Sequence, residues 1–365
     1  MHDPFASIKR SAQRLGLLSG AALAVLFGAG QPADALVITP QFDPSWSTNP
    51  NQAQATAAVN AVISEYETDF SNPVTVTVLF SWNTLAGSPL TSGAATSFPQ
   101  LSTFPTPANE YTLTQTKGFY TTAVGSPGAT AVLQTANNHL PASYANPGGL
   151  TNNFFLPDAE YLALNGVAQN ADLTNAMVGF ANDFCGTGAP NCAYNYTGSG
   201  ANQIDFTAVA EHEIAHALGR VDWAFSSGTP GGAPPYLTVG DFFKYTCGTG
   251  TLNPTFSQTC FSFDGDTTNP GGKQFSPVSD SYDWSSCNNG LGPCPAVGDS
   301  FDAFIAPGEA SSISTADIDL MCALGWNDRG VCGTPQVAAA PEPGTLALLG
   351  SSLLGFAAWR RRRRT

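Results

Sequence analysis

The sequence predicts an α+β fold in which a small mixed sheet and a helix with paired histidines precede a loop-rich, disulfide-bonded C-terminal subdomain. Three observations favour this prediction. Residues 74–80 alternate like a half-buried strand, and residues 205–219 have the spacing of a capped, core-facing helix. All eight cysteines lie between Cys185 and Cys332. The 365-residue chain is 42% hydrophobic, which is enough for a sizeable core.

The regular elements of the first half come in a helix–strand–strand order. Residues 52–70 predict a helix, and the β-branched, alternating run 74–80 predicts a strand. Residues 176–181 predict a second short strand. The segments between them are rich in Pro, Gly and Ser and predict loops. The apolar residues of this helix include Ala57, Ala58, Val59, Val62 and Ile63.

The second half has few periodic runs and holds every cysteine. We expect one domain over residues 36–332, divided into a sheet and helix subdomain (36–222) and a disulfide-rich subdomain (223–332). An even number of cysteines in an exported chain indicates disulfides, and local pairing closes the shortest loops. Sequence alone leaves the connectivity open. The neighbouring cysteines are Cys185 and Cys192, Cys247 and Cys260, Cys287 and Cys294, and Cys322 and Cys332.

The N-terminal segment 1–35 is typical of a signal peptide. Basic residues precede an apolar stretch at 15–30, and Ala33-Asp34-Ala35 is a small-x-small cleavage sequence. The alternative is an uncleaved anchor helix. The apolar stretch is shorter than the roughly 20 residues that a membrane span needs, which favours cleavage.

The C-terminal end has a second targeting pattern. After a linker at 333–340, Pro-Glu-Pro is followed by an apolar run at 345–359 and five arginines. This order resembles the PEP-CTERM sorting tails of Gram-negative bacteria, over residues 341–365. The resemblance implies processing by an exosortase, transient membrane association, and release to the envelope or extracellular matrix. A permanent C-terminal anchor is the alternative, although about 15 apolar residues are few for a span.

The body of the chain is strongly acidic. Between residues 36 and 340 there are five basic and 24 acidic side chains, a formal charge of −19. Such a surface repels polyanions, so we expect no binding to nucleic acid.

The segment from Asp205 to Asp222 contains the residues with recognisable chemistry. Asp205 is a good helix N-cap, and a glycine at 219 is a good helix end. His212 and His216 are one helical turn apart, so both imidazoles can reach one metal ion. Glu213 lies beside them, where it can act on a water molecule. These residues predict a zinc site with Glu213 as the catalytic base.

A catalytic zinc ion needs three protein ligands and one open position. Outside the signal segment the chain has only one further histidine, His139, which is predicted to lie in a polar loop. The third ligand is therefore a carboxylate or His139. Asp222, three residues beyond the glycine, and Asp241 are the two carboxylates considered.

The pattern HExxHxxGxxD resembles the metzincin metalloproteases, and its terminal aspartate resembles the snapalysin-type variants. The resemblance implies a metzincin-like zincin catalytic domain and a zinc ligand set of His212, His216 and Asp222. The methionine turn of that family is not evident in this sequence.

Several short motifs in residues 45–326 also resemble metalloproteases that have PEP-CTERM tails. Among these motifs are Gly240-Asp241-Phe242, Tyr282-Asp283-Trp284 and Leu324-Gly325-Trp326.

The predicted function is a secreted zinc metalloendopeptidase that hydrolyses protein or peptide substrates. The alternative is a catalytically weak or inactive binding protein of the envelope or biofilm matrix on the same scaffold. A zinc hydrolase of another substrate class is a further alternative, but export and disulfides argue against it. Asp264-Gly265-Asp266 could in addition contribute oxygen ligands to Ca²⁺.

Overall fold

The computed structural model describes residues 35–90, 95–99, 110–126, 128–144, 153–167, 174–181, 193–198, 200, 203–221, 237–253, 259–265, 273–276, 282–285, 298–303, 305–327 and 332. The predicted signal peptide, apart from its last residue Ala35, and the predicted sorting segment lie outside these residues. No helix in the described part of the chain is both long enough and apolar enough to cross a membrane.

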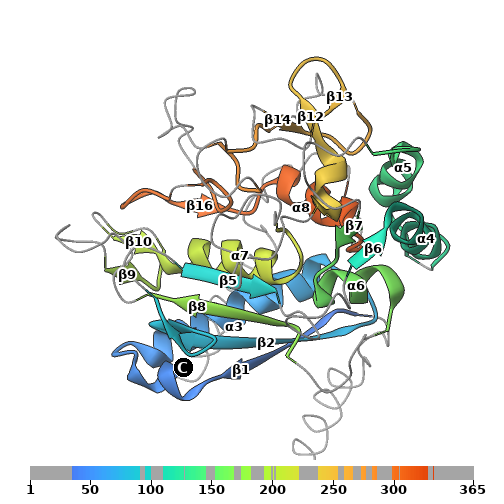
Figure 1. Cartoon of the computed structure of the whole chain (residues 1–365). Coiled ribbons are helices and arrows are strands. Elements are labelled where there is room, and N and C mark those ends of the chain that lie inside the picture. The colour runs from blue at the N-terminus through green and yellow to red at the C-terminus, as the bar shows by residue number, and fades with distance from the viewer. Residues whose placement is uncertain are drawn as a thin grey trace, which may run out of the picture.

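A four-stranded mixed sheet forms the base of the molecule (Figure 1). Its strand order is β1-β2-β8-β5, with β1 (Val37–Phe42), β2 (Thr75–Trp82) and β8 (Ala176–Phe180) parallel. The edge strand β5 (Ala95–Pro99) runs antiparallel to β8. The strands expected at 74–80 and 176–181 are confirmed as β2 and β8. The sheet is mixed, as the sequence predicted.

Two helices cover one face of this sheet. Helix α3 (Gln52–Asp69) packs against β1, and α7 (Phe206–Ala217) packs against β5 and β8. The two helices also contact each other. The hydroxyl of Tyr66 on α3 donates a 2.8 Å hydrogen bond to the carbonyl of Glu211 on α7. Both helices lie where the sequence predicted them, and α3 ties α7 to the sheet.

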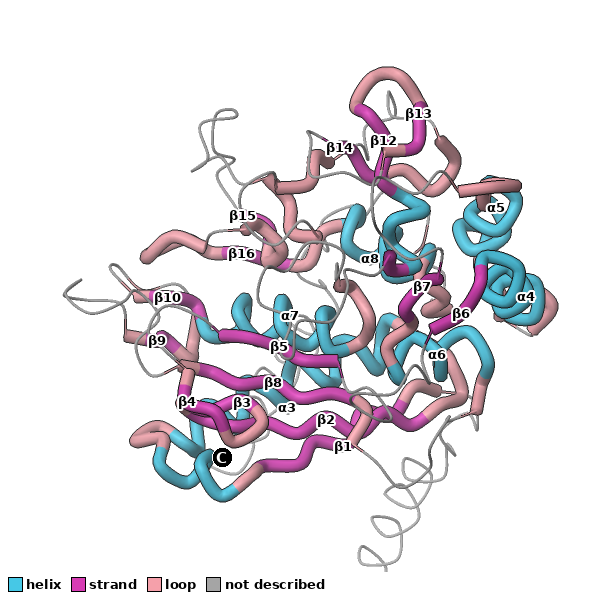
Figure 2. Tube along the Cα trace, in the orientation of Figure 1, coloured by secondary structure: helices cyan, strands magenta, loops and turns pink. Residues whose placement is uncertain are grey.

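Further elements complete the fold. The helices are α4 (Leu113–Val124), α5 (Ala131–His139), α6 (Asp158–Asn165) and α8 (Thr315–Ala323), with 3-10 turns η1 (Pro44–Thr48) and η2 (Val239–Phe243). The strands are β3 (Thr84–Leu85), β4 (Ser88–Pro89), β6 (Glu110–Thr112), β7 (Asn153–Phe155), β9 (Tyr194–Asn195), β10 (Ile204–Asp205), β11 (Leu237–Thr238), β12 (Lys244–Thr246), β13 (Thr251–Leu252), β14 (Thr259–Phe261), β15 (Gly298–Asp299) and β16 (Ser311–Ser312). Helix α8 and strand β16 lie on the side of α7 away from the sheet, whereas β3 and β4 lie beside the sheet (Figure 2).

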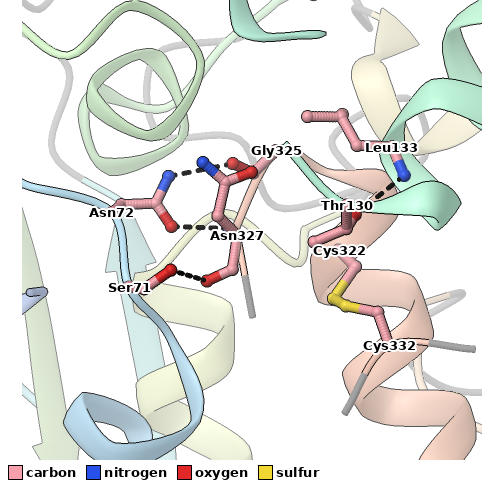
Figure 3. Close-up of a disulfide and its surroundings, with 8 residues drawn as sticks. All are labelled: Ser71, Asn72, Thr130, Leu133, Cys322, Gly325, Asn327 and Cys332. Carbon is pink, nitrogen blue, oxygen red and sulfur yellow. Dashed lines mark hydrogen bonds between the residues drawn. A yellow bond between two sulfur atoms is a disulfide. The ribbon is translucent and has the colours of Figure 1, made fainter. Parts of the chain in front are cut away.

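One hydrophobic core joins the two halves of the chain. It extends from Leu36 through the sheet and α7 to Trp326. The indole of Trp326 donates a 3.0 Å hydrogen bond to the carbonyl of Leu218, directly after α7. Asn72 donates to the carbonyl of Gly325 and accepts from the backbone of Asn327 (Figure 3). The end of the described chain is thus held against the first strands of the sheet and the end of α7.

Two disulfides follow the predicted local pairing. Cys247–Cys260 links the residue after β12 to the central residue of β14, and Cys322–Cys332 links the last turn of α8 to the chain that follows it (Figure 3). Their sequence separations are 13 and 10 residues, so each closes a short loop. The other four cysteines lie outside the described residues. In the described part of the C-terminal half the strands are only two or three residues long. This agrees with the prediction that the C-terminal subdomain is rich in loops.

Candidate metal centre

Helix α7 forms where its sequence predicts it because both of its ends are capped and one face is apolar. The Asp205 carboxylate accepts hydrogen bonds from the backbone N–H of Thr207 (2.9 Å) and Ala208 (3.5 Å). Apolar residues recur every four positions along its core-facing side and are fully buried; they are Phe206, Ala210, Ile214 and Leu218. This packing fixes the helix, so the opposite face presents its histidines in a defined direction.

The C-terminal end of α7 is a Schellman turn. The backbone N–H of Arg220 bonds to the carbonyl of Ala215 (3.0 Å), and that of Gly219 bonds to the carbonyl of His216 (3.0 Å). Gly219 has φ +115°, in a region that residues with a side chain rarely adopt. The turn reverses the chain so that the carbonyl of Arg220 meets the ring of His216.

Gly219→Ala is expected to lower the free energy of unfolding by about 1–3 kcal/mol, because the positive φ strains any side chain. A Cβ at this position would also lie 2.7 Å from Cβ of Glu160. The measurement is urea unfolding of the metal-free protein. Gly166→Ala is the matched control, since Gly166 also ends a helix with positive φ (+71°) but has open space around it. An equal effect of both substitutions would show that contact with Glu160 is unimportant.

Three potential ligand atoms converge beside α7. Nε2 of His212 and Nε2 of His216 are 2.9 Å apart. Oδ1 of Asp283 lies 3.2 Å from each of them. Among the described residues, these three side chains are the group of metal-ligand type that the structure brings together. His216 and Asp283 are buried, and His212 is partly exposed.

The other ring nitrogens show which atoms carry the protons. Nδ1 of His212 lies 2.9 Å from the carbonyl of Ser300, and Nδ1 of His216 contacts the carbonyl of Arg220. A carbonyl oxygen only accepts, so both Nδ1 atoms must donate. In the neutral imidazoles both Nε2 atoms then carry lone pairs. Two lone pairs and a carboxylate oxygen repel each other unless a cation lies between them.

The distances fit a small divalent cation. Two ligands at about 2.0–2.1 Å from one tetrahedral zinc ion stand about 3.3 Å apart. The observed separations of 2.9 Å and 3.2 Å are close to this value. Two imidazoles and one carboxylate are a known ligand set for catalytic zinc, and a fourth position stays open.

In the metal-free site, the negative charge of the buried Asp283 carboxylate needs a positive charge beside it. Burial acts to lower the pKa of His212, but the neighbouring Asp283 outweighs this effect and raises that pKa. Burial acts to raise the pKa of Asp283, but both histidines hold it well below the usual range. A proton on the imidazoles therefore compensates Asp283 when no metal is bound. A metal ion would replace that proton.

Glu213 lies next to these ligands on α7 and is buried. Its charge contributes to the raised pKa of His212, after the larger effect of Asp283. Burial raises the pKa of Tyr194 on β9, and the charge of Glu213 raises it further. Glu213 therefore lies close enough to act electrostatically on both groups. It is not among the three converging ligands.

The three alternatives considered for the third ligand have different positions. Asp222 lies outside the described residues. The carboxylate of Asp241 accepts hydrogen bonds from Thr238 and is paired with Lys244 at 3.5 Å, so it caps η2. His139 is exposed in the last turn of helix α5 rather than in a loop, and its Nδ1 bonds to the carbonyl of Thr135 one turn earlier.

Asp283 was not identified as a ligand from the sequence. It comes from a segment with only isolated strand pairing, 67 residues beyond His216, where no periodicity indicates which side chains meet. The one available signal was an acidic residue between two aromatic residues, Tyr282 and Trp284. Asp264, expected at a calcium site, accepts a hydrogen bond from Ser262, and Asp266 lies outside the described residues.

Comparison with known proteins identifies the C-terminal tail. Residues 339–363 match the family of the PEP-CTERM protein-sorting motif, in agreement with the tail predicted at 341–365. The motif indicates an exported protein that the exosortase machinery sorts to the cell envelope of Gram-negative bacteria. No curated protein and no solved structure matches the chain.

Proposed function

We propose that the chain is a secreted zinc-dependent endopeptidase. His212, His216 and Asp283 hold the ion, and Glu213 is the general base. The observation that supports this proposal most strongly is the convergence of two Nε2 atoms and a carboxylate oxygen within 2.9–3.2 Å. Both Nδ1 atoms bond to backbone carbonyls, so in neutral imidazoles both Nε2 atoms carry lone pairs. A cation is the partner that suits two such lone pairs together with a carboxylate oxygen.

The roles follow from the chemistry of each group. A zinc ion in this position supplies a Lewis acid for the scissile carbonyl and makes a water molecule more acidic. Glu213 accepts a proton from the attacking water and delivers it to the leaving amine. Glu213 is buried, so its carboxylate lies in a region of low dielectric. Bulk water there screens its electrostatic interactions with the reacting groups only weakly.

An extended peptide fits the edge of the sheet as substrate. Strand β5 is the end of the order β1-β2-β8-β5, and no strand of the described residues pairs with its outer edge. It also contacts α7, which carries the histidines (Figure 1). A substrate backbone can add to such an edge through main-chain hydrogen bonds, largely independent of its side chains. This favours an endopeptidase over a hydrolase of small molecules.

The proposed site of action is outside the cytoplasm. The sorting motif and the two disulfides both support an exported enzyme. The HExxHxxGxxD pattern suggests Asp222 as the third ligand, whereas the geometry favours Asp283. A binding protein without activity on the same scaffold would hold the ion equally well, so hydrolysis itself must be measured.

Removal of the metal provides the first test. Dialysis of the exported protein against a chelator is expected to abolish cleavage of casein, and one equivalent of Zn²⁺ is expected to restore it. Ca²⁺ alone should not restore activity, because it prefers six to eight oxygen ligands. Full activity in the chelated, zinc-free protein would refute the proposed mechanism. Stoichiometric zinc without cleavage of any protein would favour the binding protein.

A further inference from the structure

Arg220 is a fully buried cation three residues beyond the end of α7. Its guanidinium donates from Nη1 to Oδ1 of Asp317 at 2.8 Å. It also donates twice to the carbonyl of Tyr282, from Nε at 3.2 Å and from Nη2 at 3.0 Å. The guanidinium carbon lies 3.9 Å from the ring centre of Phe301 and 4.6 Å from that of Trp284. All of these partners are buried.

Three of these partners are sequence neighbours of a ligand or of a residue that fixes one, and the backbone of Arg220 itself contacts a ligand. The backbone carbonyl of Arg220 accepts the Nδ1 proton of His216. Tyr282, which receives two guanidinium hydrogen bonds, immediately precedes Asp283. Phe301 follows Ser300, whose carbonyl accepts from His212, and the ring of Phe301 stacks on that of His212 with centres 5.4 Å apart. One residue therefore touches the surroundings of all three ligands.

The guanidinium is itself anchored to a rigid element. Asp317 lies in the first turn of α8, and its Oδ2 accepts hydrogen bonds from the backbone and hydroxyl of Ser314. The indole of Trp284 also donates to Oδ1 of Asp317 at 2.6 Å. These contacts hold the Arg220–Asp317 pair in the core that α8 shares with α7.

The segment that carries Asp283 needs such support. Residues 282–285 form no helix or continuous strand, and their pairing consists of isolated bridges at Trp284. The backbone hydrogen bonds of residues 283–285 tie this segment to residues 274–276 and 301–303 rather than to α7. Regular secondary structure therefore does not fix Asp283 against α7, and side-chain contacts must do so.

We propose that Arg220 is the positioning residue of the metal centre. Its backbone orients His216 and its guanidinium holds the Asp283 segment against α7, so that the ligand triangle exists before the ion binds. This inference deepens the proposed function and rests on it. A lysine cannot replace the arginine, because a single ammonium lacks the planar fork that serves Asp317 and the Tyr282 carbonyl together.

The test compares zinc affinity in variants of the exported, disulfide-bonded protein. Arg220→Lys keeps the charge beside Asp317, and Arg220→Met/Asp317→Asn removes the cation without leaving a lone buried carboxylate. Both are expected to bind zinc about 10–100-fold more weakly than wild type, as for the loss of other groups that orient metal ligands. Affinity is measured by competition with a chromogenic chelator at a temperature where every variant is folded. If the double variant does not fold, Arg220→Lys decides the question.

Lys244→Met is the matched control. Lys244 is an equally buried cation, paired with Asp241, and it lies 4.6 Å from the ring of Tyr282 rather than at its carbonyl. We expect this variant to lower the unfolding temperature and to keep the zinc affinity of wild type. The positioning role is overturned if the Arg220 variants bind zinc as tightly as wild type, or if Lys244→Met weakens binding as much. Absence of zinc binding in wild type would instead refute the metal site itself.

Discussion

Glu213→Gln is expected to lower kcat/KM for peptide hydrolysis by about 10²–10⁴-fold, the usual contribution of a general base. The substitution keeps the size of a buried side chain and removes only its ability to accept the proton. Because Glu213 is not one of the converging ligands, the variant should bind zinc in the same ratio as wild type. The measurement pairs a quenched fluorescent peptide assay with metal analysis of the same preparation.

Glu160→Gln is the control for this experiment. Glu160 is another fully buried glutamate, on α6, and burial raises its pKa well above the usual range. Burial thus favours the protonated form of this side chain, which glutamine resembles in size and in lack of charge. We expect wild-type activity from this variant. If Glu213→Gln cleaved peptides as fast as Glu160→Gln, Glu213 would not be the base.

Asp283→Asn should weaken zinc binding by more than about 100-fold, beyond the usual effect of a group that only orients a ligand. The amide keeps the shape of the side chain but loses the charge that draws the ion between two imidazoles. Hydrolysis should fall in parallel, since the ion supplies the Lewis acid. The measurement is zinc affinity by chelator competition, with activity recorded in excess zinc.

Asp222→Asn is the decisive comparison for the ligand set. The structure brings Asp283 to the histidines, so the Asp222 variant is expected to bind zinc as wild type does. The reverse result, with zinc lost on changing Asp222 and kept on changing Asp283, would restore the ligand set that the metzincin resemblance implies. A loss in both variants would mean that the ion has two carboxylate ligands.

Local sequence signals predicted the elements that position the site. The alternation in residues 74–80, the Asp205 cap and the glycine at 219 each express a short-range rule, and β2 and α7 formed accordingly. The two local disulfides followed from loop length. The antiparallel edge strand β5 was not predicted, because its pairing with β8 joins residues about 80 positions apart.

In the candidate site, too, the sequence predicts the local features but not the contacts between distant residues. Two imidazoles on one helical turn are visible in the sequence, because their spacing alone places them on one face. Asp283 and Arg220 enter the site through long-range packing: the guanidinium reaches Tyr282 across 62 residues and Asp317 across 97. No periodicity or capping rule records such contacts. These contacts form because a buried charged group must be paired or hydrogen-bonded, and the core offers few groups that can do this.

Anomalous diffraction at the zinc absorption edge, on crystals of the exported protein, tests the central claim most directly. We expect one strong peak at about 2.0–2.2 Å from Nε2 of His212, Nε2 of His216 and a carboxylate oxygen of Asp283. A crystal structure grown with zinc in which this position holds no metal, or in which the two histidine rings point apart, would contradict the account.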